Sequence, residues 1–332
     1  MGENPLLEIK QLKTYFYTFD GVVKALDGVD LTVYEDETLG IVGETGCGKS
    51  VASLSVLRLV PPPGKIESGE IWFGGENLLD KSEREMRDIR GGRISMIFQD
   101  PMSSLNPVFT IGDQIGAVLR VHQNLSRKEA RHRAIEIFRT VRLPDADQML
   151  DKYPHELSGG MLQRVMIGIA LSCQPRLLIA DEPTTALDVT IQAQILKLMR
   201  DLKNELRTSI LLITHDLGVV AKVCERVAVM YAGTFVEVGA LRTVFKGPKH
   251  PYTQGLLRTI PRLGDKRERL DIIAGRVPDL IHPPSGCHFH PRCPQAMDVC
   301  REVRPPMAAV EAGHEVACHL YPADGRQRGT SA

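Results

Sequence analysis

Five short, continuous apolar runs, each followed by residues at helical spacing, place the strongest constraint on the fold of this 332-residue chain. The runs are Leu39–Val42, Ile94–Phe98, Leu177–Ala180, Ile210–Thr214 and Val227–Met230. Such runs are typical of strands that are buried on both faces of a parallel sheet. After Asp188, a favourable N-cap, apolar residues recur along one helical face. We therefore predict an α/β fold, a P-loop (RecA-like) parallel sheet core.

Two other stretches differ from this pattern. Val29, Leu31 and Val33 alternate with polar residues, which indicates a small antiparallel β subdomain before the core. From about residue 110 to 155 helix signals replace strand signals, and Ser126 with Glu129 forms a predicted capping box. We interpret this stretch as a helical insertion in the α/β domain.

The C-terminal part changes character again. After Gly247 the chain is rich in proline and turns, and it holds four of the seven cysteines. We expect an α/β domain over residues 1–246, with a helical subdomain at about 100–157, and a small Cys/Pro-rich extension over 247–332. The last residues, from about Ala323, are polar and are expected to fray.

Charge and hydropathy exclude several classes of protein. The chain has 41 basic and 41 acidic residues, so its zero net charge argues against a nucleic-acid partner. No apolar stretch approaches the ~20 residues that span a bilayer, and residues 1–5 lack the features of a signal peptide. We therefore expect a cytosolic protein, in which the seven cysteines do not form structural disulfides.

A glycine-rich loop follows the first apolar run and matches the phosphate-binding P-loop pattern. It reads Gly43-Glu44-Thr45-Gly46-Cys47-Gly48-Lys49-Ser50, and Val51 continues into a predicted helix. Glycines let backbone N–H groups curl around phosphates, and the helix N-terminus adds its dipole. Lys49 is expected to neutralise the β and γ phosphates, and Ser50 to bind Mg²⁺. The predicted ligand is a nucleoside triphosphate with Mg²⁺.

A second apolar run ends in paired carboxylates. Asp181 and Glu182 follow Leu177–Ala180, and a buried strand that ends in two acids is otherwise costly. Downstream of a P-loop, Asp181 would hold the hydrated Mg²⁺, and Glu182 would orient or activate the attacking water. Taken alone, the pair is equally consistent with an exposed strand end.

Ser158, Gly159 and Gly160 precede a predicted helix. Ser158 is its predicted N-cap, and the unpaired N–H groups of such a helix start suit a γ-phosphate. Taken alone, plain capping is the better interpretation of these residues.

The order of these motifs resembles the nucleotide-binding subunit of an ABC transporter, over about residues 6–245. The matching elements are the P-loop, Gln99 after a strand, Leu157-Ser158-Gly159-Gly160, the strand ending in Asp181-Glu182, Ala186-Leu187-Asp188 and Thr214-His215-Asp216. The resemblance implies ATP hydrolysis. Two departures from the family pattern are Met161, where Gln is common, and Asp36 in a turn where glycine is usual. Aspartate tolerates left-handed geometry better than most residues, so the second departure is mild.

The resemblance also implies roles for single residues. Gln99 would join Ser50 at the Mg²⁺ and sense a membrane subunit. His215 would contact the γ-phosphate and steady Glu182 and the water. Asp188 would link two active sites across a dimer interface.

The adenine contact is less specific. An aromatic residue ahead of the P-loop would stack on the base, and Phe16 is the candidate, with Tyr15 and Tyr17 as neighbours. A place in the strand core is the alternative for each of the three.

ABC subunits work in head-to-tail pairs, so the resemblance implies partners. Ser158, Gly159 and Gly160 would cap nucleotide held by a second ABC ATPase subunit, in a homo- or heterodimer. Two transmembrane permease subunits, coupled through the helical insertion, and an extracytoplasmic solute-binding protein complete the implied assembly. The chain would be a peripheral protein on the cytoplasmic face of the cell (inner) membrane.

The C-terminal extension resembles that of the dipeptide and oligopeptide importer ATPases. The matching segments are His250-Pro251-Tyr252-Thr253-Gln254-Gly255-Leu256-Leu257 and Pro283–Pro294. Thr184–Asp188 and Met161 resemble the first of the two ATPases of such importers. The implied cargo is a short peptide, while nickel or another solute is the alternative.

Cys287, Cys293, Cys300 and Cys318 lie in this extension without a Cys-x-x-Cys spacing. Four cysteines in a small module that can scarcely build its own core suggest ligation of a [4Fe-4S] cluster, which some members of the family carry. Zinc or no metal are the alternatives. Most of the histidines around them, His282, His288, His290, His314 and His319, are expected at the surface. Cys47, Cys173 and Cys224 are expected to be small buried residues.

Two functions from other classes are considered. One is a soluble ABC ATPase of DNA repair or translation, which the charge balance and the absence of tandem cassettes in the sequence disfavour. The other is a regulatory module whose cysteines sense redox state, which the intact catalytic set disfavours.

Overall fold

The computed structural model describes residues 4–185, 187–259 and 273–321, and the chain forms two compact units. Unit 1 contains residues 34–37 and 80–212, and unit 2 contains residues 5–33, 38–79 and 213–321. Ala186 and the segment after Ala323, for which predictions were made, lie outside the described residues.

Unit 2 begins with an antiparallel sheet that confirms the predicted β subdomain. Its strand order is β2-β1-β4-β5, with β1 Pro5–Thr18, β2 Gly21–Tyr34, β4 Gly64–Phe73 and β5 Glu76–Asn77. β1 pairs antiparallel with β4, from Leu7 opposite Phe73 to Phe16 opposite Gly64. Val29, Leu31 and Val33 are buried, as their alternation predicts.

The other strands of unit 2 run in the order β11-β12-β10-β9-β3. They span Thr38–Val42 (β3), Arg226–Tyr231 (β9), Thr234–Ala240 (β10), Ala308–Glu311 (β11) and His314–Val316 (β12). β3 is parallel to β9, whereas β10 pairs antiparallel with both β9 and β12. The sheet is therefore mixed and not purely parallel as predicted, because β10 of the α/β domain and the strands β11 and β12 of the extension pair antiparallel with their neighbours.

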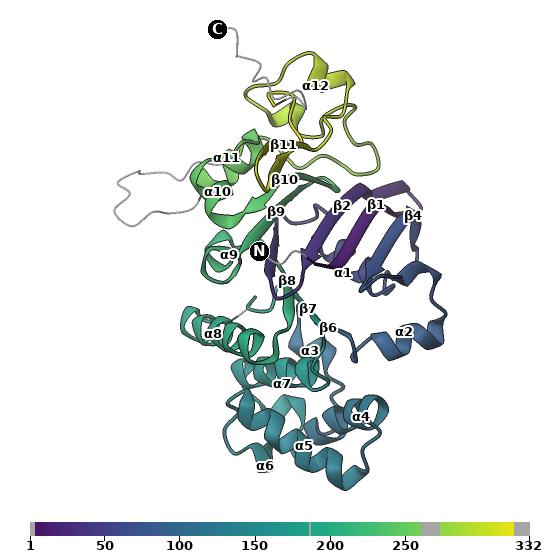
Figure 1. Ribbon diagram of the computed structural model, residues 1–332, viewed down its shortest axis with the longest axis vertical. Helices are drawn as coiled ribbons and strands as arrows, with labels where there is room; N and C mark the ends of the chain where they lie inside the picture. The colour runs from purple at the N-terminus through teal and green to yellow at the C-terminus, as the bar shows by residue number, and fades with distance from the viewer. Residues whose placement is uncertain (1–3, 186, 260–272, 322–332) are drawn as a thin grey trace. The chain divides into compact units, whose positions relative to one another are not determined.

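Short helices accompany these strands (Figure 1). They are α1 Lys49–Val56, α9 Leu217–Val223, α10 Leu241–Lys246, α11 Pro251–Arg258, η3 His290–Arg292 and α12 Val299–Glu302. α1 ends before Pro61, as the sequence predicts.

Unit 1 contains the strands β8, β7 and β6, in this order. They span Ser209–Thr214 (β8), Leu177–Asp181 (β7) and Ile94–Ile97 (β6). β6 and β7 are parallel, and all residues of the three strands are buried, which confirms the predicted sheet. The expected strand at Ile94–Phe98 ends one residue early, since Phe98 is exposed.

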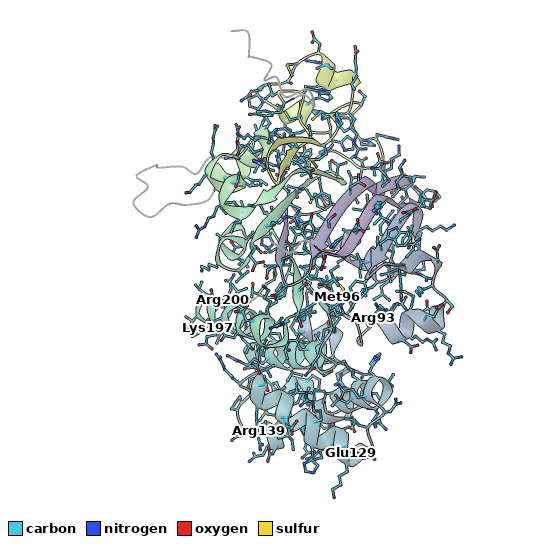
Figure 2. The ribbon with its side chains drawn as sticks, viewed as in Figure 1. Arg93, Met96, Glu129, Arg139, Lys197 and Arg200 are labelled. Atoms are coloured by element: carbon cyan, nitrogen blue, oxygen red, sulfur yellow. The ribbon has the colours of Figure 1, made fainter. Side chains whose placement is uncertain are left out.

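Helices form the rest of unit 1, and α4, α5, α6 and α7 gather in one cluster (Figure 1). After η1 (Leu78–Asp80), the helices are α2 Glu83–Ile89, α3 Pro101–Ser104, α4 Ile111–Gln123, α5 Arg127–Thr140, α6 Ala146–Met149, η2 Pro154–Glu156, α7 Gly159–Leu171 and α8 Val189–Leu206. Ser126 and Glu129 form the predicted capping box of α5. α8 buries Ile195, Leu198 and Leu202, while Lys197 and Arg200 lie on its exposed face (Figure 2).

Within the described ranges, no helix has both the length and the apolar character required to cross a membrane. All seven cysteines are free of disulfide bonds. Cys47 and Cys224 are buried, whereas Cys173 is half-buried.

Candidate functional site

The phosphate loop, residues 43–50, connects β3 to α1 in unit 2. Gly48 is the N-cap of α1 with a φ of +108°, and a Cβ at this position would lie 2.5 Å from the carbonyl oxygen of Ala25. Only glycine fits this conformation and this space. The helix start therefore presents backbone N–H groups at the loop, as an anion site requires.

Lys49 is 6% exposed and is held by the loop itself. Its Nζ donates to the carbonyl oxygens of Gly43, at 2.8 Å, and Glu44, at 3.0 Å. Cys47 is buried beside it, and burial raises the pKa of this thiol, partly offset by the Lys49 charge. Ser50 lies half-buried in the first turn of α1. The loop thus carries one buried cation next to the predicted phosphate cradle.

The predicted carboxylates lie in unit 1. β7 ends at Asp181, which is buried, and Glu182 follows with a φ of +46°. This left-handed conformation is uncommon for a residue other than glycine, and such strain often marks functional positions.

Glu182 is brought together with Gln99, although they are 83 positions apart in the chain. Gln99 Nε2 donates to Glu182 Oε2 at 3.1 Å, and Thr185 Oγ1 donates to the same oxygen at 2.9 Å. Both donors fix the orientation of the carboxylate. Thr185 was not predicted as a site residue, and its place three residues after Glu182 is the only sequence signal for it.

Ser158 is the backbone N-cap of α7, but its side chain makes no capping hydrogen bond, which corrects the predicted side-chain cap. A Cβ at Gly160 would lie 2.9 Å from Ile191 Cγ2, so this helix start packs closely against the start of α8. Asp188 caps α8 as predicted, because its Oδ1 accepts from the N–H groups of Thr190 and Ile191 at 3.0 and 2.9 Å.

The three aromatic candidates for adenine differ in their surroundings. Phe16 is half-buried and packs on Gly64, where a Cβ would lie 2.7 Å from its ring. Tyr15 donates to Asp27 Oδ1 at 2.9 Å, and burial, together with Asp27, raises the pKa of Tyr15 to about 12. Tyr17 is exposed, with the Lys65 ammonium 5.5 Å from its ring centroid. Tyr15 and Phe16 therefore contribute to packing in this sheet.

His215 is exposed and follows β8, one residue before the cap of α9. It belongs to unit 2 with the phosphate loop, whereas Gln99, Ser158–Gly160, Asp181, Glu182 and Asp188 belong to unit 1. Each unit therefore carries part of the predicted set.

The extension makes contacts with the phosphate loop that the sequence did not reveal. Arg292 forms a bidentate ion pair with Glu44, at 2.7 and 3.0 Å, and the Tyr252 hydroxyl accepts from the Glu44 N–H at 2.9 Å. Both residues lie in segments that carried the family resemblance, but nothing in their spacing indicates this contact.

The four cysteines of the extension lie near one another. Burial, together with the neighbouring cysteines, raises the pKa of Cys287 to about 11 and that of Cys318 to about 12. The Cys287 N–H donates to the Cys300 carbonyl at 2.8 Å, which ties their loops together. Among the described residues, however, no group of three or more His, Cys, Asp or Glu side chains converges to hold a metal ion. The donor chemistry fits a thiolate-bound metal, while the side chains do not form a coordination shell.

The expectation that most of the surrounding histidines lie at the surface is wrong, because only His282 is exposed and His314 is fully buried. This residue is 0% exposed, and its Nε2 lies 2.8 Å from Oε1 of Glu237, which is also fully buried. Glu237 Oε2 accepts from the backbone N–H of His250 at 2.9 Å. The pairing satisfies a buried carboxylate that would otherwise be costly.

Comparison with known sequence families gives two matches. Residues 26–185 match the family described as ABC transporter, and residues 236–300 match the family described as the C-terminal region of the oligopeptide/dipeptide transporter.

Curated proteins are similar over almost the whole chain. The probable peptide ABC transporter ATP-binding protein y4tR of Sinorhizobium fredii is 53% identical over 96% of this chain and 97% of its own length. The oligopeptide transport ATP-binding protein AppD of Bacillus subtilis is 51% identical over 97% and 99%. The dipeptide transport ATP-binding protein DppD of Bacillus subtilis is 50% identical over 95% and 94%.

Solved structures are similar to the cassette part. The dimeric, post-hydrolysis structure of the ATP-binding cassette MJ0796 bound to ADP and Pi has a TM-score of 0.64 at 28% identity, covering 71% of this chain and 99% of that one. cbiO1 from Clostridium perfringens, part of the complex cbiONQ, has a TM-score of 0.63 at 29% identity, covering 74% and 92%.

Proposed function

This chain belongs to the ABC transporter family of ATP-binding subunits, with the C-terminal region of the oligopeptide and dipeptide transporters, and we propose that it powers import of short peptides. Its cassette is an ATPase. The peptide cargo rests on the relatives, which are described as peptide, oligopeptide and dipeptide transport proteins. The peptide cargo is tested by measuring the uptake of labelled dipeptides and of nickel by cells with and without this chain. If only nickel uptake were lost without the chain, the peptide assignment would be contradicted.

The nucleotide site is proposed from the residues of the loop and of the strand ends. Lys49 and the N–H groups at the start of α1 bind the β and γ phosphates. Ser50, Gln99 and Asp181 would hold Mg²⁺, directly or through water, and the ion would neutralise the charge that develops on the phosphates. Phe16 is the proposed adenine contact, and His215 the proposed γ-phosphate contact.

Glu182 is proposed as the residue that activates the attacking water. The hydrogen bond from Gln99 to its Oε2 is the observation that carries this assignment, because it orients the carboxylate through a residue already predicted to bind Mg²⁺. Glu182→Gln should lower ATP turnover by about 100-fold or more, the usual contribution of a general base. ATP binding should remain.

Glu156→Gln is a suitable control, since Glu156 is an exposed carboxylate in the same unit with a surface ion pair to Lys152. The role of Glu182 is decided by measuring ATP turnover for both variants. Unchanged turnover in Glu182→Gln would exclude Glu182 as the base.

Partner subunits are proposed from the family and from an exposed apolar surface. Met102, Val108 and Phe109 follow Gln99 closely and are 50%, 71% and 52% exposed. A cluster of exposed apolar side chains is typical of an interaction site. We propose that two permease subunits dock near this segment, at the cytoplasmic face of the membrane, and that a second ATPase subunit completes the pair around Ser158–Gly160 and Asp188. Co-purification with the permeases from membranes, lost in Val108→Asp, is the expected result.

The four cysteines are proposed to bind a structural [4Fe-4S] cluster. Their support is four neighbouring thiols in a segment with little core of its own. Iron, sulfide and zinc analysis of the anaerobically purified protein distinguishes a [4Fe-4S] cluster from zinc and from no metal. Cys287→Ser should lower the iron content, whereas Cys173→Ser should leave it unchanged. Absence of iron in the anaerobic protein would contradict the proposal.

A further inference from the structure

The C-terminal extension contacts the phosphate loop through Glu44. The Arg292 guanidinium binds both carboxylate oxygens of Glu44, and the Tyr252 hydroxyl accepts from the Glu44 backbone N–H. Arg292 lies in η3 and Tyr252 in α11, so two separate segments of the extension converge on one loop residue. All of these residues belong to unit 2.

Arg292 is built into this position. Its side chain is 5% exposed, and every N–H donor of the guanidinium has an acceptor. Besides Glu44, the acceptors are Tyr231 Oη at 3.3 Å and the carbonyl oxygens of Ile273 and Ala274 at 3.2 and 2.9 Å. A buried guanidinium needs an anionic partner, and Glu44 is the carboxylate that supplies it.

Tyr252 is held just as firmly. It is fully buried, and its ring packs on Tyr231 at 4.6 Å and on Phe289 at 5.4 Å between centroids. His250 caps the start of its helix by accepting from the Tyr252 N–H at 3.0 Å. The hydroxyl that meets Glu44 is therefore a fixed acceptor rather than a mobile surface group.

Fixing Glu44 also fixes the groups that hold Lys49. The Glu44 carbonyl accepts from Lys49 Nζ, and so does the carbonyl of the preceding residue, Gly43. Glu44 thus has its N–H and side chain bound to the extension and its carbonyl bound to the lysine of the phosphate loop. We propose that Arg292 and Tyr252 are positioning residues for the phosphate loop, so that the affinity for ATP depends on the docked extension. This inference rests on the proposed nucleotide site.

The test is the dissociation constant of a fluorescent, ribose-labelled ATP analogue with Mg²⁺, measured on the full chain. Arg292→Gln should raise it roughly tenfold, within the range typical of coupling between two sites. The dissociation constant of Arg292→Lys should lie between those of the unchanged protein and of Arg292→Gln, because lysine keeps the charge but loses the planar guanidinium fork. Tyr252→Phe removes only the acceptor and keeps the packed ring, and it should raise the constant about threefold.

A double-mutant cycle separates positioning from folding. The double variant Glu44→Gln/Arg292→Gln should bind the ATP analogue no more weakly than the weaker of the two single variants, because each substitution removes the same ion pair. The KM for ATP should rise while kcat at saturating ATP stays within about twofold, a split that a loss of folded protein would not produce. Glu311→Gln, which breaks the Lys249–Glu311 ion pair of the extension away from the loop, is the matched control.

The outcomes distinguish this inference from the proposed function. If the unchanged protein binds no nucleotide, the proposed function fails. The positioning role is overturned if the unchanged protein binds nucleotide and the dissociation constants of Tyr252→Phe and Arg292→Lys both stay within twofold of its value. The thermal midpoints of both variants must be unchanged for this conclusion. Additive effects in the cycle would overturn it as well.

Discussion

The phosphate loop and the C-terminal extension keep their shapes by different means. The loop is held mainly by backbone atoms: Lys49 binds two loop carbonyls, and the Cys47 carbonyl accepts from the Gly233 N–H at 2.9 Å. The extension is joined to other parts of unit 2 by the β10–β12 backbone ladder and, in addition, by side-chain pairs. Examples are Arg292 with Glu44, Arg304 with Asp27, and His314 with Glu237.

This difference has a physical consequence. A loop built mainly on backbone geometry tolerates side-chain changes except where a side chain binds the ligand, where it anchors the loop as Glu44 does, or where a glycine is required. Where the extension relies on buried polar and charged groups, such as Arg292, its stability depends on the partner of each group and, for a titratable group, on its protonation state. The following predictions test this contrast.

The largest effect is expected in the loop itself. Lys49→Ala should lower ATP turnover by about 1,000-fold, near 4 kcal/mol, because the lysine proposed to bind the β and γ phosphates is lost. Turnover at saturating Mg-ATP is the measurement. The thermal midpoint should change little, because the glycine geometry remains.

Lys197→Ala, on the exposed face of α8, is the control (Figure 2). Equal losses of turnover in the two variants would indicate a general effect of lysine removal. A large fall in the thermal midpoint of Lys49→Ala would show that the loop, like the extension, depends on its charge for folding.

The next effect concerns acid stability of the extension. Burial lowers the pKa of His250 from 6.5 to about 4, only partly offset by Glu237, and its Nδ1 accepts from the Tyr252 N–H. The folded protein thus keeps a neutral ring while the unfolded chain binds a proton below pH 6.5. Stability should therefore fall as the pH drops from 6.5 towards 4, by about 3 kcal/mol at most. Urea midpoints at pH 7, 5.5 and 4.5 measure it.

His250→Asn keeps a capping acceptor and removes the titration, so its stability should depend less on pH over this window. Identical pH dependence in both proteins would assign the acid sensitivity to another group, such as the half-buried His288, whose pKa burial also lowers.

The strands, helix starts and turns that the sequence predicted are determined by residues that lie close together in the chain. The five strands of the parallel part were visible as apolar runs, whereas the buried strand β10 was not predicted. Ser126 with Glu129 and Asp188 revealed helix starts, because a cap and its N–H partners are a few residues apart. Asp36 has a φ of +57°, as expected for the residue that replaces glycine in its turn. The phosphate loop could likewise be predicted, because its residues are consecutive in the chain.

The contacts that the sequence did not predict join distant residues. Arg292 and Glu44 are 248 positions apart, and His314 and Glu237 are 77 apart. A single sequence contains no period or spacing that reveals such pairs, since they follow from how the extension packs on the sheet. Buried charges are also rare, which is why the histidines were expected at the surface.

A matched pair of loop glycines includes the smallest expected effect, that of Gly46→Ala. Gly46 and Gly48 have φ values of +82° and +108°, so alanine is strained at both. A Cβ at Gly48 would also lie 2.5 Å from the Ala25 carbonyl oxygen, whereas nothing lies within 4 Å of a Cβ at Gly46. Gly48→Ala should cost about 3 kcal/mol, from strain and overpacking together, and Gly46→Ala about 1 kcal/mol from strain alone.

The urea midpoints of these two variants decide whether steric space or backbone conformation limits the loop. Similar losses near 1 kcal/mol would mean that the strand carrying Ala25 yields to the added methyl group, so that the loop is less rigid than its backbone contacts indicate. A larger loss in Gly48→Ala would show that steric space limits the loop.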